Sequence, residues 1–303
     1  MKAFKNVSVY VEGKGIVKSS VYFDEKIEKI GGCMKGAEEI SLPEGAVVLP
    51  GFIDEHIHGA GGSDAMDGTT KDLSIIAETV AKEGTTTFLA TTMTQSKENI
   101  LKAMRAVKEY RETGSEKGAR IAGIHLEGPF IAAAHKGAQP LEYVAAPNAE
   151  VFDEYNEASG NCIKIITLAP EVDGAIGFIR HLKEKGVVVS IGHTGAKCTE
   201  VLQAMDAGAT NITHTYNAQS PLHHREIGVV GSALLFDDLY CELISDTIHV
   251  SVPAMQLLVK NKKADKLALI TDAMRAKGLA DGISELGGQT VIVKNGEARL
   301  QDG

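Results

Sequence analysis

The chain has 303 residues, 44% of them hydrophobic, and carries a formal net charge of −9. Its length suits one large α/β domain, and its acidic balance argues against nucleic-acid binding, which normally uses a basic surface. No apolar run is long enough to span a membrane, no signal-peptide pattern opens the chain and no CxxC pair occurs among the four cysteines, so we expect a cytoplasmic protein with free thiols.

Residues 1–46 predict a small β-module that resembles a β-sandwich. Polar and apolar side chains alternate there between glycine-bearing turns. No later part of the sequence offers strands that return to this module. We therefore expect a C-terminal segment, absent from this sequence, to complete it.

Residues 47–303 predict a (β/α)8 TIM-type barrel, because apolar strands alternate with helical segments. The predicted strands are 46–58, 85–93, 120–128, 163–171, 186–194, 210–218, 239–246 and 266–274, and the clearest helical segments are 71–84, 96–114, 175–186 and 198–208. An open doubly wound sheet is the alternative, but no glycine-rich nucleotide loop follows the first strand. A hairpin at 285–303 takes the place of an eighth helix, so we expect the barrel to be incomplete at its C-terminal end.

Ligand-type side chains recur where the predicted strands end. His56 and His58 stand one residue apart at the end of the first strand, so both point to the same side. Other strand ends carry Glu127, His193, His214 and Asp272. Because the carboxyl ends of parallel strands meet at one mouth of a barrel, we expect these side chains to converge there.

Imidazole and carboxylate groups together suit Zn²⁺ or Fe²⁺. Taken singly, His193 or His214 could be a hydrogen-bonded core histidine and Asp272 a helix N-cap. Their recurrence at successive strand ends favours a metal site. A metal lowers the pKa of bound water from about 15.7 toward 7, and Asp272 is the candidate to shuttle the proton.

The pattern of HxH after the first strand, histidines after the fifth and sixth, and aspartate after the eighth resembles the amidohydrolase superfamily. The motifs HLEGPF, SIGHT, THTYNA and ITDAM resemble, within it, the N-acetylglucosamine-6-phosphate deacetylase family. The fourth strand lacks the lysine that bridges two metals in many superfamily members. The resemblance implies one or two Zn or Fe ions per chain. It implies metal ligation by Glu127, His193 and His214, a second-metal pair in His56 and His58, and acid/base catalysis by Asp272.

The same resemblance implies a set of substrate contacts. Asn217, Ala218 and Arg225 would contact a phosphate, to which arginine can donate paired hydrogen bonds; by itself the segment could also be a solvated loop. His249 would bind the sugar or the amide oxygen. Ala138 and Gln139 match another substrate-contacting loop of the family, and some members carry histidine where Gln139 stands. His125, two residues before Glu127, is expected to support or pack rather than to bind.

The resemblance implies hydrolysis of the acetamide of N-acetylglucosamine 6-phosphate, giving glucosamine 6-phosphate and acetate in amino-sugar catabolism. It also implies a homodimer, in which Arg225 could reach a neighbour's active site. Two alternatives stay open from the sequence. One is another hydrolase of the superfamily, acting on a cyclic amide, a purine or an N-acyl amino acid; the other is a barrel without catalytic activity.

Overall fold

The structure, a computed structural model, describes residues 1–114 and 117–301. It divides into two compact units, Met1–Phe52 and Ile53–Gly303. Within the described ranges, no helix has both the length and the apolar character needed to cross a membrane.

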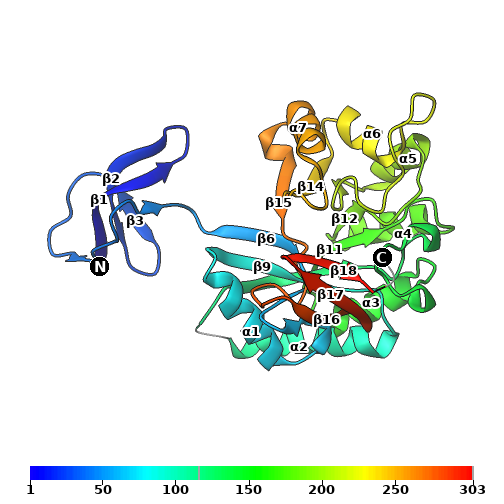
Figure 1. The fold of residues 1–303 in the computed structure, drawn as a ribbon, viewed down its shortest axis with the longest axis horizontal. Coiled ribbons are helices and arrows are strands. Elements are labelled where there is room, and N and C mark those ends of the chain that lie inside the picture. Colours follow the sequence, from blue (N-terminus) through cyan, green and yellow to red (C-terminus); the bar gives the residue numbers. More distant parts are fainter. Residues whose placement is uncertain (115–116, 302–303) are drawn as a thin grey trace. The chain divides into compact units, whose positions relative to one another are not determined.

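The first unit is a single five-stranded sheet, coloured blue in Figure 1. Its strands are β1 (Lys2–Val11), β2 (Gly15–Phe23), β3 (Ile27–Ile30), β4 (Glu38–Glu39) and β5 (Val47–Val48). The sequence predicts one strand over 46–58, but Val47 and Val48 pair with β1 instead. Pro50, which has no N–H to donate to a sheet, separates them from the first barrel strand.

The second unit contains the expected barrel sheet, with eight parallel strands in sequence order. These are β6 (Phe52–Ile57), β9 (Thr85–Thr92), β10 (Arg120–Glu127), β11 (Ile163–Leu168), β12 (Val188–Ile191), β13 (Asn211–Ile212), β14 (Tyr240–Ile244) and β15 (Leu267–Ile270). The prediction of a (β/α)8 barrel is thus confirmed.

Helices cover the outside of this sheet (Figure 1). They are α1 (Thr70–Ala81), α2 (Lys97–Thr113), α3 (Ala149–Ala158), α4 (Ala175–Glu184), α5 (Cys198–Ala207), α6 (Gly228–Leu235) and α7 (Val252–Asn261). Thr69 and Ser96 cap α1 and α2 by accepting hydrogen bonds from backbone amides in the first turn. The apolar stripe of α1, including Leu73, Ile76 and Val80, is buried in the core.

The two edge strands, β6 and β15, are joined by the residues at and just beyond their carboxyl ends. The amide of Asp272 donates to the His56 carbonyl at 2.9 Å, and the amide of His58 donates to the Ala273 carbonyl at 2.9 Å. The buried Asp54 carboxylate accepts the Thr271 hydroxyl at 2.6 Å. The sheet therefore closes at its mouth, and this closure brings Asp272 to the two histidines of β6.

Several smaller elements lie in the loops between the barrel strands and after β15. They are β7 (Gly59–Ala60), β8 (Ser63–Asp64), η1 (Ala65–Asp67), η2 (Ala133–His135), η3 (Leu141–Tyr143), η4 (Ala264–Lys266) and the antiparallel sheet of β16 (Gly282–Leu286), β17 (Gln289–Lys294) and β18 (Glu297–Leu300). The predicted hairpin at 285–303 is therefore part of a three-stranded sheet, and its last two residues, 302–303, lie outside the described residues. Gln289 ties this sheet to the loop after β10 by donating to the Ala138 carbonyl at 2.5 Å.

The β7–β8 hairpin and the segment after β15 leave no room for a side chain at Gly59. A Cβ atom there would lie 2.3 Å from the Ser63 carbonyl oxygen and 2.9 Å from the Arg275 amide nitrogen, both backbone atoms. We predict that Gly59→Ala lowers the free energy of unfolding by about 1–3 kcal/mol, the usual cost of overpacking. Urea unfolding followed by circular dichroism measures it.

Gly177→Ala is the matched control, because Gly177 lies in α4 and a methyl group added there would have no neighbour within 4 Å beyond its own helix. This variant should gain about 0.5–1 kcal/mol, since alanine stabilises a helix relative to glycine. Equal stabilities for the two variants would contradict the tight packing at Gly59.

Candidate metal centre and its cavity

The barrel brings together all six residues that the sequence predicts as ligands or acid/base. Glu127 is the last residue of β10, and His193, His214 and Asp272 each lie two residues beyond their strand. These three have φ angles of 48°, 29° and 48°, in the left-handed region that residues other than glycine rarely adopt. Such backbone strain clusters at functional sites, where the surrounding structure holds it in place.

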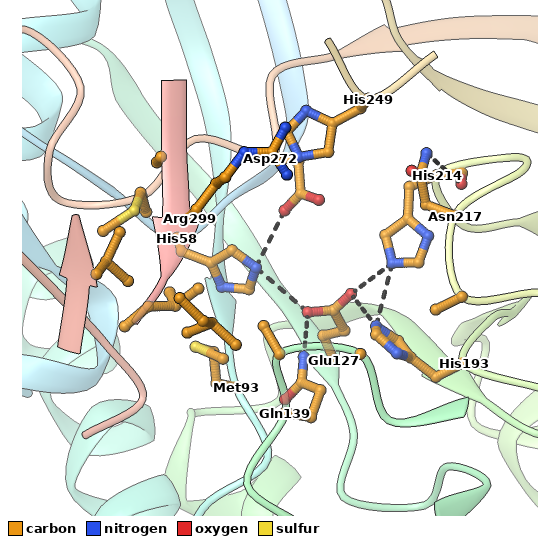
Figure 2. A pocket seen from close by; sticks show the side chains of 18 residues that line it. His58, Met93, Glu127, Gln139, His193, His214, Asn217, His249, Asp272 and Arg299 are labelled. Atoms are coloured by element: carbon orange, nitrogen blue, oxygen red, sulfur yellow. Dashed lines mark hydrogen bonds and ion pairs between the residues drawn. The ribbon is translucent and has the colours of Figure 1, made fainter. Parts of the chain in front are cut away.

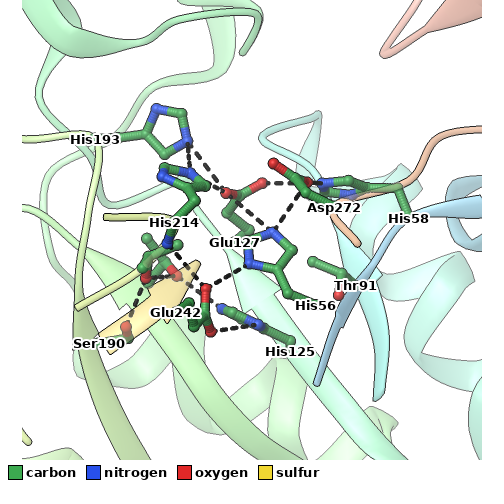
Figure 3. Close-up of polar contacts among 12 residues, drawn as sticks. His56, His58, Thr91, His125, Glu127, Ser190, His193, His214, Glu242 and Asp272 are labelled. Atoms are coloured by element: carbon green, nitrogen blue, oxygen red, sulfur yellow. Dashed lines mark hydrogen bonds and ion pairs between the residues drawn. The ribbon is translucent and has the colours of Figure 1, made fainter. Parts of the chain in front are cut away.

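The Glu127 carboxylate lies at the centre of the cluster and is 1% exposed. Its Oε1 atom is 3.1 Å from both His193 Nε2 and His214 Nε2, and 3.4 Å from His56 Nε2. Its Oε2 atom is 3.2 Å from His58 Nε2. Figures 2 and 3 show these imidazoles directed at the one carboxylate. Glu127 therefore contacts histidines from three different parts of the barrel mouth.

The cluster contains two sets of ligand-type atoms close enough to hold a cation. One set is Glu127, His193 and His214, and the other is His56, His58 and Asp272, with the atoms of each set within 4.8 Å of one another. Asp272 Oδ1 is 3.4 Å from His56 Nε2 and 3.2 Å from His58 Nε2. Because Glu127 also contacts both histidines of the second set, the two sets are contiguous.

Hydrogen bonds on the outer side of two imidazoles show that the cluster fits a metal. His193 Nδ1 is 3.0 Å from the His135 carbonyl, and His56 Nδ1 is 2.9 Å from a carboxylate oxygen of Glu242. Both partners can only accept, so each Nδ1 carries a hydrogen and a neutral ring has its lone pair on Nε2. Those lone pairs point at carboxylate oxygens, an arrangement that needs a cation between them.

Opposite charges in the cluster stabilise one another. Burial favours the neutral acid, but the positive charge of His56 and hydrogen bonds from His193 and His214 hold the pKa of Glu127 well below its ordinary value. Burial likewise opposes charge on His58, yet hydrogen bonds to Asp272 and Glu127 raise the pKa of His58 to about 10. The carboxylates thus favour positive charge here, which protons supply in the metal-free chain and a divalent cation would supply instead.

The cluster forms the floor of a cavity of about 370 Å³ (Figure 2). Glu127, His58, His193, His214 and Asp272 line its floor. The sheet β16–β18 contributes Leu286, Val291, Ala298, Arg299 and Leu300 to the wall, with Met93 and Met274 beside them. A largely apolar wall over a polar floor is the usual form of a small-molecule site of this size.

Most of the predicted substrate residues lie on the wall of this cavity. Ala138, Gln139, Asn217, Ala218 and His249 all line it. Asp246 Oδ2 accepts a hydrogen bond from His249 Nδ1 at 2.6 Å, which leaves His249 Nε2 for a bound molecule. Arg225 is the exception. It is exposed, lies outside the lining and contacts His224 Nε2 through its guanidinium at 2.8 Å.

Gln139 has a protein partner at each end of its amide. Its Oε1 accepts from the Thr94 backbone amide at 2.7 Å, and its Nε2 donates to Glu127 Oε2 at 2.7 Å. The side chain is 3% exposed. In this arrangement Gln139 fixes the orientation of the central carboxylate, a contact that the sequence alone does not indicate.

Two further contributors, Glu242 and Arg299, are missing from the sequence-based prediction. Glu242 lies on β14 and contacts His56. The one sequence signal for this role is a charged residue within the otherwise apolar run YCELI. Arg299 is the one lysine or arginine among the described residues lining the cavity. His125 supports the core, as expected, because its two ring nitrogens lie 3.0 Å from the Glu55 carbonyl and 2.7 Å from Thr167 Oγ1.

Known proteins are similar to this chain in sequence and in fold. The amidohydrolase family profile matches residues 47–287. The N-acetylglucosamine-6-phosphate deacetylase of Bacillus subtilis is 47% identical over 88% of this chain and 68% of its own length. The crystal structure of the Thermotoga maritima enzyme of the same name aligns over 99% of this chain and 78% of its own, with 36% identity and a TM-score of 0.87.

A third similar protein was solved with a bound ligand. A mutant N-acetyl-D-glucosamine-6-phosphate deacetylase of Mycobacterium smegmatis, solved in complex with N-acetyl-D-glucosamine-6-phosphate, is 27% identical to this chain with a TM-score of 0.89. It aligns over 100% of this chain and 78% of its own length. The chain described here therefore spans about two thirds of the B. subtilis relative and more of each solved structure.

Removing the central carboxylate should weaken metal binding strongly. Loss of a residue that only supports a metal ligand costs about 10- to 100-fold in affinity. Because Glu127 would itself be a ligand, we predict that Glu127→Ala weakens Zn²⁺ binding by more than this. Equilibrium dialysis followed by metal analysis measures it. His181→Ala is the control, since His181 pairs with Asp153 on the surface, and it should bind as much metal as the unaltered chain. Full occupancy in Glu127→Ala would contradict the assignment.

Proposed function

The chain belongs to the amidohydrolase family, and from this premise we propose that it is a metal-dependent deacetylase of N-acetylglucosamine 6-phosphate. The products would be glucosamine 6-phosphate and acetate. The observation that carries the proposal is the convergence of Glu127, His193, His214 and Asp272 on the floor of one cavity, in a chain close in sequence and fold to deacetylases of that name.

One or two divalent ions, Zn²⁺ or Fe²⁺, would bind in this floor. Glu127, His193 and His214 would hold one, and His56 and His58 would hold the second. When bound, a divalent cation supplies Lewis acidity, which lowers the pKa of water and polarises a carbonyl group. The chain's own contribution is to orient the ligands, bind the sugar and move the proton.

Asp272 is the group that moves the proton. Burial would raise its pKa, but the positive charge at His56 and the hydrogen bond from His58 hold the pKa of Asp272 below its ordinary value. It is therefore ionised at neutral pH and can accept a proton from the attacking water. It then delivers that proton to the departing amine nitrogen, as a general acid.

The remaining wall residues would bind the sugar phosphate. His249, held by Asp246, can accept a hydrogen bond from a sugar hydroxyl through Nε2. Asn217 and Ala218 line the cavity and would bind at the phosphate end. Since the chain carries a net charge of −9, phosphate binding needs local donors rather than the overall field.

A test of this function compares amine release from N-acetylglucosamine 6-phosphate and from N-acetylglucosamine by metal-loaded protein. We predict a strong preference for the phosphorylated sugar. Asp272→Asn should keep the fold and the metal but lose about 10²- to 10⁴-fold in turnover, the usual contribution of a general acid/base.

Equal rates on the two sugars would support the deacetylase activity but contradict the proposed phosphate contacts. No release from either sugar by protein with bound metal would point to another amide substrate of the family. Near-normal turnover in Asp272→Asn would contradict the role of that carboxylate.

Arg225 is assigned to the neighbouring subunit's site. We propose a homodimer in which this exposed arginine, which lies outside its own cavity lining, donates to the phosphate bound by its partner. Arg225→Ala should raise KM for the phosphorylated sugar. This variant is then reassociated with Asp272→Asn and assayed at a substrate concentration far below its raised KM, where Arg225→Ala homodimers contribute little. Activity should return to about a quarter of the wild-type rate, because half of the dimers are mixed and each mixed dimer has one intact site.

No recovery on mixing would contradict a contribution across the dimer. Arg299→Ala supplies the comparison, because Arg299 lines the cavity of its own chain. A larger rise in KM in Arg299→Ala than in Arg225→Ala would assign the phosphate to Arg299 instead.

A further inference from the structure

Glu242 is a buried carboxylate that the reaction does not use directly. It lies on β14 and is 1% exposed. It is not among the residues that line the cavity, because the His56 ring lies between its carboxylate and Glu127 (Figure 3). A buried carboxylate is costly unless other groups compensate it, and an apolar side chain of similar size often serves stability as well or better. Stability therefore does not explain why this position carries a charge.

One oxygen of this carboxylate contacts both parts of the metal centre. Oε2 accepts from His56 Nδ1 at 2.9 Å and from the His214 backbone amide at 3.1 Å. His56 belongs to one set of ligand-type atoms and His214 to the other. The backbone carbonyl of Glu242 also accepts from the Thr215 amide at 2.9 Å, which holds the loop after β13 in place.

The contact with His56 has a direct chemical consequence. A carboxylate accepts only, so His56 Nδ1 keeps its hydrogen and the lone pair of a neutral ring is on Nε2. Nε2 has no hydrogen-bond partner among the described residues and faces the carboxylates of Glu127 and Asp272, each at 3.4 Å. A carboxylate behind a ligating imidazole also makes that imidazole a stronger donor to a metal.

Glu242 could instead form a separate cation site with His56 and His125, since their ligand-type atoms also lie close together. The hydrogen bonds argue against this. Both ring nitrogens of His125 are engaged, one with the Glu55 carbonyl and one with Thr167 Oγ1. His56 Nδ1 is engaged with Glu242 itself. This set therefore supports the metal centre and does not bind a cation of its own.

We propose that Glu242 is a positioning residue of the metal centre. By accepting from His56 Nδ1 and from the His214 amide, it aims the His56 lone pair at the cation and so sets the affinity of the site for metal. The inference rests on the proposed function, because it requires a resident divalent ion.

The test measures metal affinity and the state of the His56 ring, neither of which depends on the substrate. Zn²⁺ affinity is determined by competition with a chelator for the wild type, Glu242→Leu and Glu242→Gln. Leucine removes the acceptor, so affinity should fall by about 10- to 100-fold. Glutamine keeps an oxygen that can accept both hydrogen bonds, so it should restore most of that loss.

Leu243→Ala is the matched control, because Leu243 is the next residue on β14 and is buried. Its side chain points to the opposite face of the strand from Glu242. This variant should lower the melting temperature and leave the Zn²⁺ affinity unchanged, which separates a loss of stability from a loss of positioning.

A spectroscopic measurement on the wild type keeps the proposal testable even if Glu242→Leu does not fold. In Zn²⁺-loaded protein labelled with ¹⁵N-histidine, His56 should show an Nδ1–H resonance protected from exchange, assigned by its loss in His56→Ala. The absence of that resonance overturns the proposal. Wild-type affinity in Glu242→Leu, equal losses in the leucine and glutamine variants, or an equal loss in Leu243→Ala also overturns it.

The result is distinguishable from a failure of the proposed function. A wild type that binds Zn²⁺ and releases amine, beside a Glu242→Leu variant with unchanged affinity, refutes the role of Glu242 alone. A wild type that binds no divalent metal refutes the proposed function and this inference together.

Discussion

The buried carboxylate of Glu127 is the constraint on which the arrangement of the barrel mouth depends. A carboxylate that is 1% exposed must be compensated by positive charge and hydrogen bonds. Four imidazole nitrogens and the Gln139 amide surround it within 3.4 Å, and they come from loops and strands far apart in the sequence. The four histidine contacts join the end of β10 to β6 and to the loops after β12 and β13, so they form only when the barrel sheet brings these segments together.

The groups behind the imidazoles matter as much as the imidazoles. The His135 carbonyl and the Glu242 carboxylate each fix which nitrogen of a ring carries the hydrogen, and Asp246 does the same for His249 on the cavity wall. A ring held in one orientation and one tautomer can bind a metal or a substrate without rearranging. The chain thereby orients its metal-binding and substrate-binding side chains before the metal or the substrate binds.

The sequence predicts the barrel and its strand-end ligands because both depend on local signals, namely alternating strands and helices and the residue type at each strand end. It does not predict contacts that depend on distant pairing. Glu242 meets His56 across 186 residues, and Gln139 reaches the Thr94 amide across 45. Val47 and Val48 have the composition of a barrel strand, and only the pairing with β1 assigns them elsewhere. The helix α3 is absent from the sequence-based prediction. Only Phe152 and Tyr155 of its segment AEVFDEYNEA are buried, so its periodic apolar signal is short.

The most direct test of this account is a crystal structure of the Zn²⁺-loaded chain, with anomalous diffraction recorded on either side of the zinc absorption edge. The account predicts an anomalous peak about 2.0–2.2 Å from Glu127 oxygen and from the Nε2 atoms of His193 and His214. A zinc-loaded crystal with no peak at these atoms, or with its peaks only at other residues, would contradict the claim that the barrel mouth is a metal centre.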